Sequence, residues 1–264
     1  MEREKILAKI KEADMILVGL GEEFDDSRRL KDCEEYVRGC RLLAERGCSW
    51  LRPAWNEYCS AKLGGENIKQ ALQKLAELLE DKNYFVVATA TDSRICETAW
   101  KQGRLVIPCG SARKKQCGLG CGHAIIEVSP ADRETLQETF HRLYEGIFPK
   151  GAISGLGKCP QCGGDMILNN IYAENYNEAG YQEQWQLYTK WLQGTLNHRL
   201  TVLELGVSMR FPSVIRWPFE KAAYFNKKAF FIRVNETLYQ LTEELGEKGV
   251  GIPMNTIDWL RGLC

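Results

Sequence analysis

Four cysteines have the spacing of a metal site. Cys117 and Cys121 form a Cys-x3-Cys pair, and Cys159 and Cys162 belong to a Cys-Pro-x-Cys-Gly-Gly element. Two short-spaced pairs of thiolates supply the four ligands that Zn²⁺ prefers in tetrahedral geometry. Because four protein ligands close the coordination shell and leave no position for water, the pattern predicts a structural zinc ion. The alternative is two unrelated pairs of buried or redox-active thiols.

The composition and net charge of the chain exclude several classes of binding partner. Among 264 residues, 35 basic and 35 acidic side chains give a formal net charge of +0, so we expect neither nucleic acid nor an anionic membrane as a partner. No apolar run approaches the ~20 residues of a membrane span, and the charged N-terminal stretch lacks the apolar core of a signal peptide. Eleven cysteines at irregular spacing favour a reducing compartment, and we expect a cytoplasmic protein.

Apolar runs alternate with helical patterns along the chain. Five runs predict buried strands, over residues 13–21, 84–89, 104–108, 200–206 and 229–234. The apolar spacing elsewhere predicts helices, over residues 3–12, 34–46, 66–81, 93–102, 131–145, 178–196, 213–226 and 257–263. Buried strands alternating with helices imply a mostly parallel sheet covered on both faces, so the predicted fold class is α/β.

Ligands of such sheets bind at the carboxyl ends of the strands. These ends are the segments 19–23, 88–93, 108–111 and 206–208, and Asn235. Gly19 and Gly21 could open a dinucleotide loop, although Phe24 stands where the full G-x-G-x-x-G pattern needs a small residue. The same glycines also suit an ordinary strand-to-helix turn. Asn235, which ends the fifth strand, could bond a ribose hydroxyl.

Two carboxylates follow the first loop directly. Glu22 and Glu23 would stabilise a helix N-terminus through the helix dipole, but they would repel a pyrophosphate at the same place. Gly206, Val207 and Ser208, at the end of the fourth strand, form a second candidate nucleotide contact. The glycine permits a close approach to the backbone, and the hydroxyl can bond to ribose or phosphate. Each of these residue types is also common in turns that bind no ligand.

The likeness to a known family lies in two stretches. Residues 158–166 read KCPQCGGDM, and residues 203–220 read LELGVSMRFPSVIRWPFE. On these motifs, and on the FFIRVN run that ends at Asn235, the chain resembles the sirtuins, the family of NAD-dependent protein deacylases and ADP-ribosyltransferases. It is most similar to their bacterial macrodomain-linked branch, and the likeness extends over about residues 10–240.

The resemblance implies an architecture and a set of ligands. The large domain would be a Rossmann-like parallel sheet formed by residues 1–108 and 176–264, with a helical part over 30–80, and the small zinc-binding domain would be inserted at 109–175. NAD or ADP-ribose would bind between them, and a modified protein or peptide would be a further partner. The implied nucleotide contacts are Gly19, Gly21, Glu22, Thr89, Asp92, Gly206, Val207, Ser208 and Asn235.

Several residues depart from the sirtuin pattern. The family's first loop, Gly-Ala-Gly-Ile-Ser, is replaced by Gly-Leu-Gly-Glu-Glu, and the Pro-Asp-Phe-Arg arm that covers the cofactor is not found. After the second strand, Ala90 replaces the Asn that positions the ribose and the reacting water. Asp92, whose implied catalytic role is to bond the nicotinamide amide, is kept.

The position of the catalytic histidine is also changed. Cys109 lies eight positions before Cys117, where the family has its His, and the macrodomain-linked branch usually has Gln there. A deacylating sirtuin needs a base with a pKa near 7, whereas an unperturbed thiol has a pKa of about 8.5. Cys109 can therefore act as base or nucleophile only if neighbours lower its pKa. His123, His141 and His198 are expected to be structural or exposed.

Three readings of the function remain. We favour a sirtuin-like protein that binds NAD or ADP-ribose with degenerate deacylase residues. The second reading is an active NAD-dependent ADP-ribosyltransferase or deacylase with altered chemistry. The third is a protein-interaction scaffold that has lost the nucleotide. The first two are favoured by the retained residues Asp92, Gly206, Ser208 and Asn235, and the first and third by the changed residues Glu22, Glu23, Ala90 and Cys109.

Overall fold

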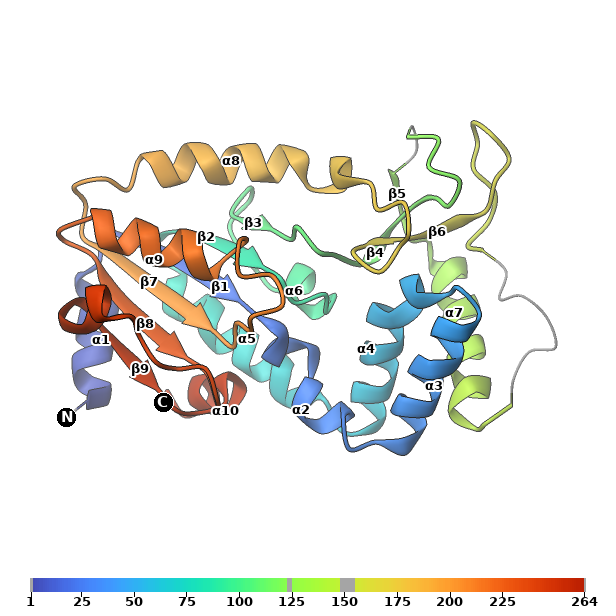
Figure 1. Cartoon of the computed structure of the whole chain (residues 1–264), viewed down its shortest axis with the longest axis horizontal. Helices are drawn as coiled ribbons and strands as arrows, with labels where there is room; N and C mark the ends of the chain where they lie inside the picture. Colours follow the sequence, from blue (N-terminus) through green and yellow to red (C-terminus); the bar gives the residue numbers. More distant parts are fainter. Residues whose placement is uncertain (1, 123–124, 148–154, 264) are drawn as a thin grey trace.

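Two β-sheets organise the chain (Figure 1). The structure is a computed structural model, which describes residues 2–122, 125–147 and 155–263. The larger sheet has six parallel strands in the order β3-β2-β1-β7-β8-β9. Its strands are β1 (Met15–Leu20), β2 (Asn83–Ala88), β3 (Leu105–Val106), β7 (Leu200–Leu205), β8 (Phe230–Val234) and β9 (Gly249–Ile252). The strand order reverses at β1, and ligands of such sheets bind at the carboxyl end of this switch point.

Helices cover both faces of the larger sheet. Every residue of β1 is buried, because alternate side chains enter two separate apolar clusters. Ile16 and Val18 pack with α1 (Glu2–Glu12), α5 (Glu66–Leu79) and α10 (Thr256–Arg261). Met15 and Leu17 pack with α8 (Gln182–Gln193) and α9 (Arg216–Phe225) on the opposite face. The predicted α/β fold class with a covered parallel sheet is therefore confirmed.

A smaller antiparallel sheet lies beside the first, and helices pack against it. Its strands have the order β5-β4-β6 and are β4 (Gly110–Cys117), β5 (Ile125–Glu127) and β6 (Met166–Asn170). Trp55, Phe140 and Leu168 belong to one apolar cluster. It joins β6 to α3 (Glu34–Glu45), α4 (Arg52–Lys62) and α7 (Pro130–Tyr144). We call these three helices and the smaller sheet the helical lobe.

Short helical elements lie between these strands and helices. These are η1 (Glu22–Asp25), α2 (Ser27–Leu30), η2 (Ser49–Leu51), α6 (Arg94–Glu97), η3 (Glu178–Gly180) and η4 (Glu243–Lys248). The predicted helix over 93–102 is limited to α6, because Thr98 adopts an extended backbone with ψ of 144°. The domain boundaries at residues 108 and 175 remain a prediction. Within the described ranges, no helix combines the length and apolar character that crossing a bilayer requires.

Candidate functional site

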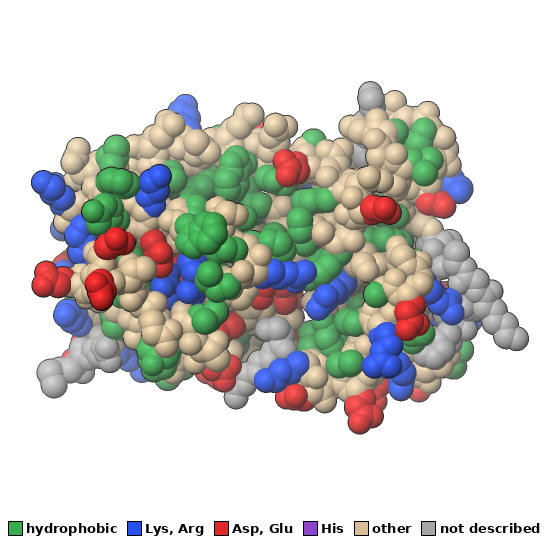
Figure 2. Space-filling model, viewed as in Figure 1, with side chains coloured by type: hydrophobic (Ala, Val, Ile, Leu, Met, Phe, Trp, Pro, Cys, Tyr) green, Lys and Arg blue, Asp and Glu red, His purple; other side chains and the backbone are tan. Residues whose placement is uncertain are grey.

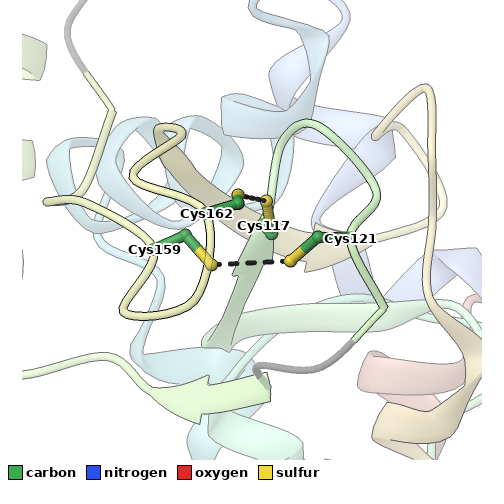
Figure 3. Close-up of side chains that lie close together, drawn as sticks. All are labelled: Cys117, Cys121, Cys159 and Cys162. Carbon is green, nitrogen blue, oxygen red and sulfur yellow. Dashed lines mark hydrogen bonds between the residues drawn. The ribbon is translucent and has the colours of Figure 1, made fainter.

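The four predicted metal ligands lie together at the end of the smaller sheet. Figure 3 shows their sulfur atoms pointing toward one another from the end of β4 and from the turn that precedes β6. The Sγ atoms of Cys117 and Cys162 are 3.4 Å apart, and those of Cys121 and Cys159 are 3.5 Å apart. All four lie within 4.8 Å of one another. A tetrahedral ion with sulfur ligands at about 2.3 Å has its sulfurs separated by about 3.8 Å, so the donor set fits such an ion.

Backbone groups prepare these thiols for a metal. Donation from the backbone of Cys121 is the main cause that lowers the pKa of Cys117 to about 6. The backbone of Gln161 likewise lowers the pKa of Cys159. Gly163 adopts φ of +72°, a conformation that favours glycine. These backbone N–H groups favour the thiolate forms of Cys117 and Cys159, and the thiolate is the form that binds metal.

The loops after β1 and β7 touch at the carboxyl edge of the larger sheet. A Cβ added at Gly21 would lie 2.2 Å from the Cα of Val207. Gly206 adopts φ of +66°, and a Cβ there would lie 2.6 Å from the Cβ of Glu23. Gly19 has a different role, since a Cβ there would lie 2.6 Å from Ile215 beside α9. Glycine is therefore required at these positions by packing, whether or not a nucleotide binds.

Glu22 and Glu23 turn toward backbone donors of this edge. The Glu22 carboxylate accepts a hydrogen bond from the N–H of Ser208 at 3.0 Å. The Glu23 carboxylate accepts from the N–H of Glu236, after β8, at 3.0 Å and from the N–H of Thr256, in α10, at 2.6 Å. Burial raises the pKa of Glu23. Two side chains of the chain itself thus satisfy N–H groups that an anionic ligand could otherwise use.

Asp92 and Thr89 occupy the end of β2. Both carboxylate oxygens of Asp92 accept from the guanidinium of Arg94, at 2.9 and 2.6 Å. Asp92 is therefore neutralised by an ion pair within the protein. The hydroxyl of Thr89 is buried and has no hydrogen-bond partner among the described residues. An unpaired buried hydroxyl is costly and suits a site that a polar ligand completes.

Two carboxyl groups near Asp92, the buried Asp25 and the half-buried Glu57, were not singled out from the sequence. Asp25 accepts hydrogen bonds from the N–H of Thr91 at 2.7 Å and from its hydroxyl at 3.2 Å. Glu57 accepts from the N–H of Ser93 at 2.9 Å. Burial, reinforced by the charge of Asp92, raises the pKa of Asp25 to about 7 and that of Glu57 to about 8. Asp25 follows the Glu22–Glu23 pair and could have been included with it, whereas the helix around Glu57 gave no signal.

Cys109 is a buried thiol and not a poised base. Its side chain is 2% exposed. Burial, together with the charges of Glu22 and Asp25, raises the pKa of Cys109 to about 12. His141 and His198 are exposed, and His123 lies outside the described residues. The described histidines therefore do not supply an imidazole in place of the family's catalytic His.

Asn235 and a buried ion-pair network hold the second glycine loop. The Nδ2 of Asn235 donates to the C=O of Val207 at 3.0 Å. Arg216 donates to the same carbonyl at 3.0 Å and pairs with Glu204 at 3.1 Å. Arg233 bonds to Glu204 at 2.7 Å. Asn235 was predicted to contact the nucleotide, and here its amide fixes the loop at residues 206–208.

Comparisons with known proteins extend over nearly the whole chain. No family model matches it. A protein ADP-ribosyltransferase of Staphylococcus aureus (strain Mu50) is 21% identical over 268 residues, which cover 94% of this chain and 82% of that protein. Among solved structures, Sir2Tm bound to a propionylated peptide has a TM-score of 0.55 at 13% identity, covering 99% of this chain and 96% of that one. An ADP-ribose complex of a mutant Sir2 homologue has a TM-score of 0.56 at 13% identity, covering 98% and 94%.

These likenesses establish the fold. The superposition takes in both sheets and nearly the full length of each chain. The chain therefore has the sirtuin fold, as its motifs predicted, with a cluster of four cysteines that could hold a metal ion. The ligands of the individual site residues remain predictions.

Proposed function

We propose that this protein binds NAD or ADP-ribose at the carboxyl edge of its parallel sheet and does not deacylate through Cys109. The observation that carries the proposal is the contact between the loops after β1 and β7 at the point where the strand order reverses. In doubly wound sheets this is where nucleotides bind. A Sir2 homologue of the same fold forms a complex with ADP-ribose.

The unpaired hydroxyl of Thr89 supports a polar ligand at this place. It is 1% exposed and lies at the end of β2, which neighbours β1. Ser208 lies at the corresponding end of β7 and is half-buried. A ribose or phosphate group between these two loops would meet a hydroxyl group from each side, that of Thr89 and that of Ser208.

The proposed absence of deacylation rests on Cys109. A base that accepts a proton at neutral pH needs a pKa near 7, and burial holds the thiol far above that value. Ala90 carries no group that could position water. Cys109 and Ala90 therefore do not supply the base and the water-positioning amide that the sirtuin pattern has at these two positions.

The metal in this proposal is a structural zinc ion. Cys117, Cys121, Cys159 and Cys162 would hold it and close its coordination shell, so its contribution would be to fix the end of the smaller sheet.

Transfer of ADP-ribose to an acceptor is the second candidate. It is favoured by the Staphylococcus aureus protein, a named ADP-ribosyltransferase that aligns with 94% of this chain. Incubation with NAD separates the candidates, because a transferase or deacylase releases nicotinamide and a binding protein does not.

Calorimetric titration with NAD and ADP-ribose tests the proposed function. We expect binding at micromolar affinity by the zinc-loaded protein. Ser208→Trp would obstruct the edge of the sheet and should abolish binding, whereas Thr135→Trp, at an exposed position of α7, should bind like the original protein. Absence of binding to both ligands in the unchanged protein would refute the proposal and favour an interaction scaffold.

A further inference from the structure

Two arginines gather around one tyrosine at the boundary between the larger sheet and the helical lobe. The guanidinium carbon of Arg52 lies 5.1 Å from the ring centre of Tyr172, and that of Arg210 lies 4.7 Å from the same centre. Arg210 also donates to the Tyr172 hydroxyl at 2.6 Å. Arg52 begins α4, Tyr172 follows β6, and Arg210 follows β7. The cluster therefore joins three separate parts of the chain.

The two positive charges lack an acidic counterpart. Among the described residues, no carboxylate lies within 4.0 Å of Arg52 or Arg210. The Nε of Arg52 is buried and has no hydrogen-bond partner, although its guanidinium also bonds to Tyr36. Two guanidinium groups around one ring repel each other unless an anion neutralises them. Each retains N–H donors in a planar fork that suits phosphate oxygens.

The cluster lies at the candidate site and not on a remote surface. The charge of Arg210 acts on Cys109, and the charge of Asp25 acts on Tyr172. Arg210 lies two residues after Ser208, whose hydroxyl accepts from the Arg210 N–H at 3.1 Å. On the face of the molecule drawn in Figure 2, basic and acidic side chains lie side by side near the middle, between the parts that carry the two sheets.

The loop after β1 cannot bind an anion through the backbone N–H groups that lie beside it. Its neighbouring backbone donors, the N–H groups of Ser208, Glu236 and Thr256, are held by Glu22 and Glu23. A phosphate group at this edge needs donors from elsewhere. Arg52 and Arg210 are cationic, both lie near the ring of Tyr172, and neither has a carboxylate partner within the described residues, so they can supply these donors.

We propose that Arg52 and Arg210 form an anion site, bridged by Tyr172, which binds a phosphate group at the boundary of the two lobes. The phosphate could belong to the bound nucleotide, in which case the inference rests on the proposed function, or to a separate phosphorylated ligand. Both sources present the same oxyanion chemistry, and the experiment separates them.

Titration with inorganic pyrophosphate and, separately, with ADP-ribose tests the site. Arg210→Gln removes an exposed guanidinium, so the variant should fold. It should bind pyrophosphate at least about tenfold more weakly, because losing a charge-assisted hydrogen bond costs about 1.4 kcal/mol of binding free energy. Arg210→Lys keeps the charge without the fork and should be intermediate. Arg52→Gln should weaken binding likewise. The matched control is Arg142→Gln, at an exposed position of α7, which should leave binding unchanged.

The outcomes are distinct. Parallel weakening of pyrophosphate and ADP-ribose supports the anion site and assigns it to the nucleotide. Weakening of pyrophosphate alone supports the site and assigns it to another phosphorylated ligand. If the unchanged protein binds pyrophosphate but neither ADP-ribose nor NAD, the proposed function fails and the anion site stands. If the unchanged protein binds no pyrophosphate, or if Arg210→Gln and Arg52→Gln bind it as tightly as the unchanged protein does, the anion site is overturned.

Discussion

Cys109 is held in its thiol form by the protein around it. With a pKa raised mainly by burial to about 12, less than about one molecule in ten thousand carries the thiolate at pH 7.5. We predict that iodoacetamide leaves Cys109 unmodified in the native protein at this pH. Peptide mass spectrometry measures the modification, and protein labelled in urea provides the positive control. If iodoacetamide modified Cys109 in the native protein as fast as a free thiol, Cys109 could not be a buried, protonated thiol.

Glu22 and Glu23 determine how readily an anion approaches the sheet edge. Replacing both by Gln removes two negative charges. The Gln oxygen at position 22 can still accept from the Ser208 N–H, and the one at position 23 can accept from one of the two N–H groups that Glu23 binds. We expect the Glu22→Gln, Glu23→Gln double variant to bind ADP-ribose about tenfold more tightly, since one unit charge at close range contributes at least about 1.4 kcal/mol in a partly buried site. Calorimetric titration measures the affinity.

The control for this variant is a second pair of neutralised carboxylates. Glu243→Gln with Glu247→Gln changes the net charge equally at exposed positions of η4. Equal gains in both double variants would attribute the effect to net charge, and unchanged affinity in both would show that the carboxylates do not oppose the ligand.

At the scale of elements, β7 and β8 are joined by a buried ion-pair network. Arg233 contacts Glu204 at 2.7 Å and Glu220 at 2.6 Å, and Glu204 is 0% exposed. Glu204→Gln leaves Arg216 and Arg233 without their central partner, so we predict a loss of about 3–5 kcal/mol in the free energy of unfolding. Urea unfolding measures it. Arg233 keeps Glu220, whereas Arg216 loses its carboxylate partner, so adding Arg216→Met should recover part of the loss. A loss below about 1 kcal/mol would show that the network is not needed for stability.

Some strands and helices could be predicted from the sequence, and others could not. Strands β1, β2, β7 and β8 were predicted because each is a continuous apolar run between polar segments. Helix α4 was missed because seven of its eleven residues are buried, which removes the polar face that gives a helix its period. Strand β4 was missed because its GSARKKQC sequence is largely polar and half-buried.

The residues of the candidate site likewise divide into those that the sequence predicted and those that it did not. Cysteine spacing predicted the cluster near β4, because metal ligands must recur at short intervals along the chain. The glycines and Asn235 were found by their places at strand ends. Arg52, Glu57 and Tyr172 were missed, since their neighbours lie far away in the sequence and only the packing of the helical lobe brings them to the site.

For the whole molecule, two carboxyl groups with raised pKa values make stability depend on pH. The pKa values of Asp25 and Glu57 are raised, mainly by burial, to about 7 and about 8. Between the ordinary carboxyl range and these values, the folded protein holds protons that the unfolded chain has released. Stability is therefore fully present at low pH and is lost as the pH rises through the folded values. We predict that the free energy of unfolding falls by about 5 kcal/mol between pH 5.5 and 8, at about 1.4 kcal/mol for each pKa unit.

A variant isolates this effect from the other titrating groups. Asp25→Asn with Glu57→Gln cannot ionise at these positions, so its dependence on pH should be flatter than that of the unchanged protein with zinc present throughout. Urea unfolding at four pH values measures both slopes. Parallel slopes would assign the pH dependence to other groups.

The cysteine cluster lies at one end of the molecule, which limits what the metal can stabilise. Cys117 ends β4 and Cys159 lies in the turn before β6, so a bound ion joins two segments. The apolar cluster at this place consists of Met166 and three of the ligand cysteines. We predict that chelation increases hydrogen exchange in β4 and β6 and leaves exchange in β1, β2 and β7 almost unchanged, because these strands are buried in their own apolar clusters. Cys162→Ser should reproduce the pattern, and Cys96→Ser, outside the cluster, should not. Faster exchange throughout the larger sheet would mean that the two lobes unfold as one unit and that the metal supports the entire fold.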